Sequence, residues 1–178
     1  MRLVLLMLIL LSPFASADEG KKINNLLDGF HLAATNSEFD NYFSRFAEQG
    51  IFLGTDAAER WNVQAFKLYA KQAFADGRGW HYEVVSRNIK INKDLAWFDE
   101  VLDNSRLGRC RGTGILLKEG GEWKIAQYSL TLLIPNEIAM VAAYAASLRG
   151  TFVPGPEGSD AGEVIAPFPE PIKDESEG

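Results

Sequence analysis

Apolar residues in the first half of the chain recur with the period of an α-helix. Within residues 21–36 they fall three and four positions apart, which places them on one face of an amphipathic helix. After Ser37, which can cap a helix, the same spacing predicts a second helix that ends at Gly50. A third helix is predicted over residues 62–74, after a short strand at residues 51–53. The apolar positions of the first helix are Ile23, Leu26, Leu27, Phe30 and Ala34.

From Trp80 onward the apolar period changes to two, which is the period of a β-strand. Tight turns rich in Asn, Asp, Ser or Gly separate the predicted strands, so the strands form an antiparallel meander. Because the helices precede the sheet instead of alternating with strands, the predicted fold class is α+β, with the helices filling the concave side of a twisted sheet. The four predicted strands are residues 80–91, 95–103, 107–118 and 123–133.

The N-terminus has the pattern of a targeting segment. Residues 1–17 combine a basic start, nine apolar residues at positions 3–11 and the small residues Ala15, Ser16 and Ala17. This order is typical of a cleavable secretory signal peptide. Nine apolar residues are too few to cross a bilayer as a helix, which takes about 20 residues. We therefore expect a periplasmic or secreted protein that begins near Asp18 and has no membrane span.

The C-terminal region changes character after the sheet. An Ala-rich helix is predicted from Pro135 to about Leu148, and Gly150 can end it. Residues 151–178 contain five prolines together with glycines and acidic residues, a composition typical of a disordered tail. The predicted domain therefore covers residues 18–150.

The charge and the residue composition indicate which molecules the protein is not expected to bind. The chain has 18 basic and 24 acidic residues, a net charge of −6, and loss of Arg2 with the signal peptide would leave 17 against 24, or −7. This acidity argues against nucleic acid and anionic membranes as partners. The single cysteine, Cys110, cannot form an internal disulfide, and His31 and His81 are not spaced as metal ligands. We expect neither a metal nor a cofactor.

Three segments resemble the SnoaL-like domains of the nuclear-transport-factor-2-like (NTF2-like) superfamily. They are FLGTDAAERW, AWFDEVLD and GRCRGTGILLKEGGEWKIAQYSLTLLIPNE, and the resemblance covers about residues 21–140. It implies a cone-shaped curved antiparallel sheet wrapped around the first long helix, with a pocket inside and a homodimer formed through the outer sheet face. The superfamily includes ketosteroid isomerase, polyketide cyclases, dehydratases and members without catalysis, so the resemblance leaves the function open.

Asp99 is the first candidate for chemistry in such a pocket. It alternates with Trp97 and Val101 on one face of a predicted strand. Burial between them would raise the pKa of its carboxyl toward the range of a general base. The alternative is that Asp99 or its neighbour Glu100 forms an ion pair with an arginine on the next strand, Arg109 or Arg111.

Two further residues accompany Asp99 as candidate proton carriers or hydrogen-bond donors. His31 faces the same side of the first helix as Phe30, so it is a candidate proton shuttle at the pocket mouth, or else a polar residue at the edge of the core. Tyr82 opens a strand and is either a donor to the ligand or an aromatic of the core or dimer interface.

The remaining candidates are neutral or aromatic. Gln127 and Ser129 occupy positions where SnoaL-like relatives often carry histidines, and neutral groups can orient a ligand but cannot carry a proton at pH 7. Trp61 is a candidate aromatic lid, and Asp56 with Glu59 has the spacing of a helix capping box. The predicted ligand-binding residues are Trp61, Trp97, Asp99, Arg111, Gln127 and Ser129.

Three functions remain compatible with this sequence. The first is binding of a small, mostly apolar ligand in the pocket without catalysis. The second is an isomerase, lyase or cyclase of the ketosteroid isomerase type, with Asp99 as base and Tyr82 or His31 as donor. The third is a structural module that dimerises through its sheet.

Overall fold

The computed structural model describes residues 13–148, which form an α+β fold as predicted. Residues up to Ile134 form one compact unit, and Pro135 begins a second. The predicted tail and all but the last five residues of the predicted signal peptide lie outside the described residues. The elements are α1 (Pro13–Thr35), α2 (Phe39–Phe43), β1 (Phe46–Leu53), β2 (Arg60–Asn62), α3 (Val63–Ala75), β3 (Glu83–Asn92), β4 (Leu95–Asn104), β5 (Gly108–Glu119), β6 (Glu122–Leu132) and α4 (Asn136–Leu148).

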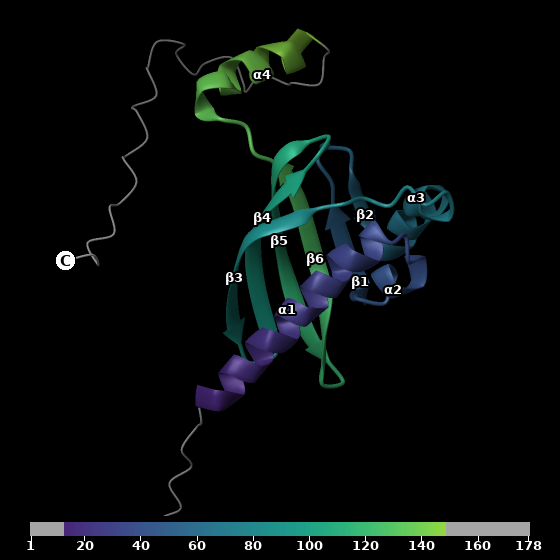
Figure 1. The fold of residues 1–178 in the computed structure, drawn as a ribbon, viewed down its shortest axis with the longest axis vertical. Coiled ribbons are helices and arrows are strands. Elements are labelled where there is room, and N and C mark those ends of the chain that lie inside the picture. Colours follow the sequence, from purple (N-terminus) through teal and green to yellow (C-terminus); the bar gives the residue numbers. More distant parts are fainter. Residues whose placement is uncertain (1–12, 149–178) are drawn as a thin grey trace, which may run out of the picture. The chain divides into compact units, whose positions relative to one another are not determined.

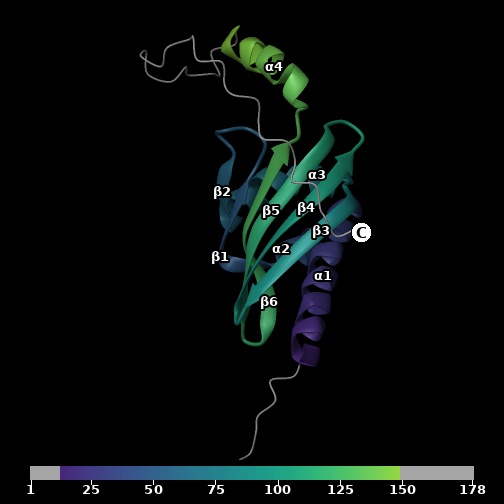
Figure 2. The same ribbon diagram turned by 90° about the vertical axis from the view of Figure 1, so that its left-hand side faces the viewer.

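Six strands form one mixed sheet in the order β2-β1-β6-β5-β4-β3. Strands β3, β4, β5 and β6 pair in this order, each antiparallel to the next, so the predicted meander is confirmed. The sheet is extended by β1, which pairs with β6 in parallel, and by β2 at the edge. Helix α1 crosses one face of the sheet obliquely (Figure 1), and the turned view shows the strands curving around that side (Figure 2).

The chain around residues 44–62 differs from the sequence-based prediction. The second helix ends at Phe43, because Phe46 and Ala47 are buried in strand β1 instead of on a helical face. Gly50 does not end a helix but lies in this strand, where a Cβ atom would come within 2.9 Å of the Ile125 carbonyl oxygen. The predicted strand at residues 51–53 is therefore only the end of β1, and the short partner strand β2 was not predicted.

The pair Asp56 and Glu59 forms only one of the two side-chain hydrogen bonds of a capping box, and not at the start of a helix. The Asp56 backbone N–H donates to Glu59 Oε2 at 3.2 Å, and the Ala58 N–H donates to Asp56 Oδ1 at 2.9 Å. These bonds close the loop between β1 and β2. Helix α3 begins later, where Asn62 Oδ1 accepts from the Ala65 N–H at 2.8 Å.

The core lies between the helices and the concave face of the sheet. Helix α1 contributes Ile23, Leu27 and Phe30, each at most 2% exposed, and strand β6 contributes Ile125 and Tyr128. Helix α4, in the second unit, has no buried residue among those described. None of the described helices has both the length and the apolarity needed to cross a membrane.

Candidate functional site

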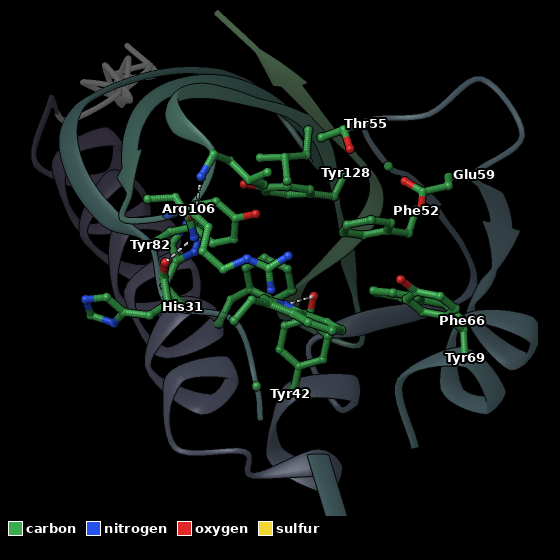
Figure 3. Close-up of a pocket in the computed structure, with 18 of the residues that line it drawn as sticks. His31, Tyr42, Phe52, Thr55, Glu59, Phe66, Tyr69, Tyr82, Arg106 and Tyr128 are labelled. Atoms are coloured by element: carbon green, nitrogen blue, oxygen red, sulfur yellow. Dashed lines mark hydrogen bonds between the residues drawn. The ribbon is translucent and has the colours of Figure 1, made fainter. Parts of the chain in front are cut away.

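A cavity of about 470 Å³ opens within the first unit, among helices α1 to α3 and the concave face of the sheet (Figure 3). Aromatic rings make up much of its wall. Phe52 stacks on Phe66 with ring centroids 4.1 Å apart, and Trp61 stacks on Tyr69 at 4.6 Å. The aromatic lining residues are Phe30, Tyr42, Phe52, Trp61, Phe66, Tyr69, Trp80, Tyr82 and Tyr128.

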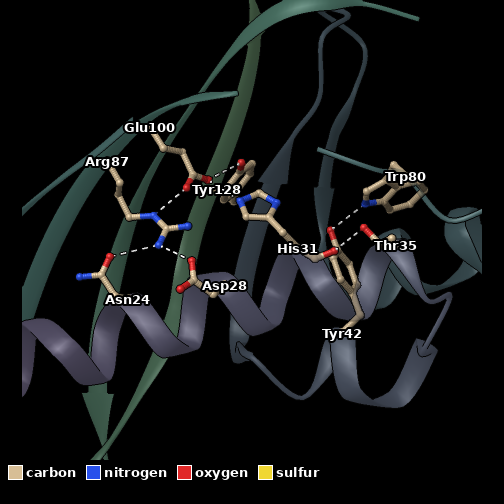
Figure 4. Close-up of polar contacts among 9 residues, drawn as sticks. All are labelled: Asn24, Asp28, His31, Thr35, Tyr42, Trp80, Arg87, Glu100 and Tyr128. Atoms are coloured by element: carbon tan, nitrogen blue, oxygen red, sulfur yellow. Dashed lines mark hydrogen bonds and ion pairs between the residues drawn. The ribbon is translucent and has the colours of Figure 1, made fainter. Parts of the chain in front are cut away.

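A buried carboxylate, Glu100, organises the polar groups at the inner end of this cavity (Figure 4). His31 Nε2 lies 2.7 Å from Glu100 Oε1, and the Tyr128 hydroxyl donates to the same oxygen at 3.0 Å. Arg87 Nε donates to the other oxygen, Oε2, at 2.8 Å. Both His31 and Tyr128 line the cavity, while Glu100 itself lies behind them. Helix α1 and strands β3, β4 and β6 each supply one member.

Arg87 connects this carboxylate to the outer side of helix α1. Its Nη1 donates to Asp28 Oδ1 at 2.7 Å and to Asn24 Oδ1 at 3.1 Å. Its Nη2 is buried and has no hydrogen-bond partner among the described residues. A positive charge that is 6% exposed therefore balances Glu100 on one side and the more exposed Asp28 on the other.

Burial and neighbouring charges determine the protonation states of Glu100 and Tyr128. Burial alone would raise the pKa of the Glu100 carboxyl, but the hydrogen bond and charge of His31 together with the charge of Arg87 outweigh it, so that pKa lies below its ordinary value. Burial, followed by the nearby Glu100 charge, raises the pKa of Tyr128 well above its ordinary value. Glu100 is thus an ionised acceptor, and Tyr128 is a neutral donor.

This arrangement determines which nitrogen of His31 faces the carboxylate. Because an ionised carboxylate only accepts hydrogen bonds, His31 Nε2 must carry a proton. The other ring nitrogen, Nδ1, has no partner among the described residues. Nε2 donates to Glu100 in both the neutral and the protonated form of the ring. In the neutral form Nδ1 is a hydrogen-bond or proton acceptor for a bound molecule, and in the protonated form it is a donor.

Two other hydroxyl groups in the cavity wall remain protonated at neutral pH. Burial raises the pKa of Tyr82 to about 12, although the nearby charge of Arg106 acts in the opposite direction. Burial also raises the pKa of Tyr42, whose hydroxyl oxygen accepts from Trp80 Nε1 at 3.4 Å. That bond uses the Tyr42 oxygen as acceptor, so the Tyr42 hydroxyl proton takes no part in it.

Strand β4 places Asp99 outside the cavity and thereby corrects its predicted position. Ala96, Phe98, Glu100 and Leu102 of this strand are buried, so the alternating residues point to the convex face. There Asp99 accepts from Asn88 Nδ2 at 3.0 Å, and it shares a shallow outer groove with Trp97 and Gln127. A ligand held inside the cone does not meet Asp99, and Glu100 is the carboxylate on the inner side.

The other predicted site residues divide between the two faces. His31, Tyr82 and Trp61 line the cavity. Arg111 is exposed and Ser129 half-buried, and neither lines the cavity. The predicted pairs with Arg109 and Arg111 do not form for Asp99 or Glu100, because Glu100 meets Arg87 and Arg109 Nε binds Asp103 Oδ1 at 2.7 Å.

A β-bulge explains why Gln127 faces outward and Tyr128 inward. Ile115 pairs with Gln127, but the next residue, Leu116, pairs with Ile125, so strand β6 has one extra residue at position 126. Ile125 and Tyr128 are consequently both buried although they are three positions apart. Sequence alternation alone placed Gln127 with Ile125 and therefore missed Tyr128, and no local residue pattern signals this bulge.

The described residues contain no group of three or more His, Cys, Asp or Glu side chains arranged to hold a metal ion. Together, the curved sheet, the helices on its concave face and the aromatic cavity define an α+β domain with the NTF2-like fold. The chain belongs to the SnoaL-like domain family, whose sequence model matches residues 23–135. The resemblance inferred from the sequence is therefore confirmed.

Solved structures with this fold have little sequence in common with the chain. An NTF2-like protein of unknown function from Pseudomonas putida has a TM-score of 0.58 and 14% identity, covering 68% of this chain and 91% of that one. A proposed aromatic ring hydroxylase from Novosphingobium aromaticivorans has a TM-score of 0.56 and 13% identity, with coverages of 67% and 92%. A proposed dehydratase of the NTF2-like family from Streptomyces avermitilis has a TM-score of 0.57 and 9% identity, with coverages of 67% and 99%. No curated protein matches the chain. At these identities the likeness establishes the fold.

Proposed function

We propose that this protein binds a small, mostly apolar molecule in the cavity of its SnoaL-like domain. The observation that supports this function is the combination of aromatic walls with a few polar groups at the inner end, His31 and Tyr128 among them. Ligand sites of this kind gain affinity from apolar burial and orientation from a small number of hydrogen bonds. The hydrogen bonds that His31 and Tyr128 make to Glu100 behind the cavity hold these two side chains in place before a ligand binds.

A matched pair of tryptophans tests this function. Trp61 lines the cavity, whereas Trp97 lies on the convex face with 47% of its surface exposed. Titration with the neutral aromatic probe 2-naphthamide, followed by calorimetry, should show binding. Trp61→Ala should weaken it about tenfold, because a large buried aromatic contact is lost, and Trp97→Ala should leave it unchanged. Absence of binding, or equal losses in the two variants, would contradict the proposal.

The second candidate function is proton transfer on the bound molecule, an activity of the isomerase, lyase or cyclase type. It is favoured by the unpaired Nδ1 of His31 in a cavity wall that also holds the neutral hydroxyl group of Tyr82, whose ring centroid lies 6.3 Å from that of His31. In this reaction His31 Nδ1 removes a proton next to a carbonyl group, and a tyrosine hydroxyl donates to the enolate oxygen. His31 takes the role that the sequence suggested for Asp99, because Asp99 lies on the other face of the sheet.

Turnover of β,γ-unsaturated ketones separates the two functions. If the protein is an enzyme, His31→Gln should lower turnover by a factor of about 100 or more, while Asp99→Asn should have no effect. Binding of 2-naphthamide should persist in both variants. Turnover that survives in His31→Gln, or that disappears in Asp99→Asn, would rule out this role for His31. Binding without turnover in the unmodified protein would support the non-catalytic function.

We also propose that the protein is exported and forms a homodimer. Export is supported by the signal-peptide pattern of residues 1–17, and N-terminal sequencing of the exported protein should find Asp18 instead of Met1. The dimer is supported by apolar residues on the convex face of the sheet, which a second copy would cover. The exposed apolar side chains of strands β4 and β5 on this face are Leu95, Trp97, Ile115 and Leu117.

A further inference from the structure

The rim of the cavity carries more positive than negative charge, in contrast to the protein as a whole. Arg78 and Arg106 line it, and Glu59 is the only carboxylate among the lining residues that the structure describes. The complete chain has a net charge of −6. An acidic protein with a basic cavity entrance draws anions to that entrance and repels them elsewhere.

The two arginines at the rim differ in their partners. Arg78 Nη2 is bound to Asp76 Oδ2 at 2.6 Å, so its charge is already compensated. The guanidinium of Arg106 has no hydrogen bond or ion pair with any residue in the described part of the chain. Its side chain extends over the cavity beside Tyr82 (Figure 3). A guanidinium that lies over this aromatic-walled cavity and has no hydrogen bond to the described protein is available to an anionic ligand.

The turn that carries Arg106 is held in position. Asn104 Oδ1 accepts from the backbone N–H groups of Arg106 and Leu107, both at 2.9 Å. Asn104 Nδ2 donates to the His81 carbonyl oxygen at 2.8 Å, which ties the turn to the segment before β3. Because all of residues 104–107 line the cavity, this fixed turn presents the base of the Arg106 side chain to the entrance.

We propose that the molecule bound in this cavity is a carboxylate, held at the rim by Arg106 while its apolar body lies among the aromatic rings. This inference rests on the proposed binding function and names the class of ligand. A guanidinium donates two parallel hydrogen bonds to a carboxylate, a geometry that a neutral polar group does not match. Ser105 on the same turn and Tyr82 beside the Arg106 side chain carry hydroxyl groups that can donate to the same carboxylate.

The proposal also orients the ligand. Arg106 is exposed, whereas His31 and Tyr128 are 7% and 2% exposed. A ligand whose carboxylate is held at the entrance therefore points its other end inward, toward His31 and Tyr128, the two cavity residues that bind Glu100. A single unpaired arginine suits one negative charge, because Arg78 is already occupied by Asp76. The ligand class that fits is a monocarboxylate with a flat apolar body.

Calorimetry with two probes of equal shape tests the inference. At pH 7, 2-naphthoate is an anion, and 2-naphthamide is its neutral counterpart. The unmodified protein should bind the carboxylate about tenfold more tightly or better, the scale of a hydrogen bond to a charged group. Arg106→Gln should reduce the preference to less than about threefold, with the affinity for the amide unchanged and with Arg106→Lys retaining part of it.

Arg60→Gln is the matched control, since Arg60 is exposed and lies outside the cavity lining. It removes the same charge and should keep the full preference. If the two probes bind equally to the unmodified protein, the carboxylate inference is wrong and the binding function stands. If neither probe binds, both are wrong. A preference that survives in Arg106→Gln, or that is lost equally in Arg60→Gln, overturns the role of Arg106.

Discussion

The two faces of strand β4 give neighbouring carboxyl groups opposite environments. Glu100, on the concave face, is 1% exposed and is bound by His31, Arg87 and Tyr128. Asp99, one position earlier, is on the convex face with an amide of Asn88 as its partner. The same chemical group is thus part of a buried ion network on one side and a half-exposed surface residue on the other. The face of the sheet on which a carboxyl group lies, more than its residue type, therefore decides whether it can act in the cavity.

The two faces of the sheet also differ in the surroundings of their side chains. On the concave face, Glu100, Arg87 and Tyr128 bind one another because an unpaired buried polar group costs free energy, and Arg87 Nη2 is the exception in this network. On the convex face, apolar side chains such as Trp97 and Ile115 remain exposed. The convex face thus leaves apolar surface exposed, which the proposed dimer would cover.

The largest expected effect comes from removing the buried carboxylate. Glu100→Ala leaves Arg87 buried and without its main counter-charge, which should lower the free energy of unfolding by about 3–5 kcal/mol. Asp99→Ala, the matched change on the convex face, should cost less than about 0.5 kcal/mol. Urea denaturation of both variants measures the difference. Equal effects would show that the two faces do not differ as described.

The next effect concerns self-association through the convex face. Trp97→Lys should weaken the proposed dimer by a factor of about 10–100, because a charged group replaces an apolar contact at the interface. Leu68→Lys introduces the same charge on helix α3, where Leu68 is 78% exposed, and should leave the dimer intact. Sedimentation equilibrium measures both constants. A monomeric unmodified protein at micromolar concentration would disprove the dimer.

A smaller effect is expected from adding one methyl group behind the network. A Cβ atom at Gly112 would collide with the Tyr128 hydroxyl and lie 2.9 Å from Glu100 Oε1. Gly112→Ala should therefore cost about 1–3 kcal/mol. Gly20→Ala is the control, since nothing lies within 4 Å of the added atom and alanine favours the helix. Thermal unfolding should show a loss for Gly112→Ala alone.

The smallest expected effect on stability comes from Glu19, which lies on helix α1 and binds residues of strands β5 and β6. Hydrogen bonds from Lys118, Lys22 and Trp123 lower the pKa of Glu19 from 4.5 to about 2. Because the pKa is depressed in the folded state, the stabilisation is complete above pH 4.5 and is lost as the pH falls toward 2. Glu19→Gln should cost about 1 kcal/mol at neutral pH, as expected for a partly exposed ion pair.

The pH dependence of that variant provides the check. Melting temperatures measured from pH 6 down to pH 2 should converge for Glu19→Gln and the unmodified protein. The exposed Glu119→Gln should run parallel to the unmodified protein over the same range. A constant gap between Glu19→Gln and the unmodified protein would mean that ionisation of Glu19 does not stabilise the fold.

The sequence predicted the meander well because its information is local. Alternating apolar residues and turns rich in Gly, Asn, Asp and Ser place strands β4, β5 and β6 within one residue of their observed ends. The sequence did not settle which side of β4 is concave, since Trp97 and Val101 on one face are as apolar as Phe98 and Leu102 on the other. Tyr128 was missed because a bulge shifts the alternation.

The centre of the site depends on contacts that no local pattern contains. Arg87 meets Glu100 across the β3–β4 pair, but it meets Asp28 across 59 positions of sequence, and His31 meets Glu100 across 69. For Glu100 the sequence suggested arginines on the following strand, Arg109 or Arg111, whereas the observed partner, Arg87, lies opposite it on the preceding strand. The two longer-range partners, Asp28 and His31, became visible once helix α1 was placed against the sheet.

These distant partners also bear on the order in which the protein folds. Helix α1 comes first in the chain, yet Glu19 is held by Lys118 and Trp123, 99 and 104 positions later. The helix cannot reach its final position until the last two strands of the meander have been synthesised and paired. Contacts of such long range slow folding, since the ends of a long loop must meet before any contact is gained. The first helix of the described chain is therefore among the last elements to reach its final contacts.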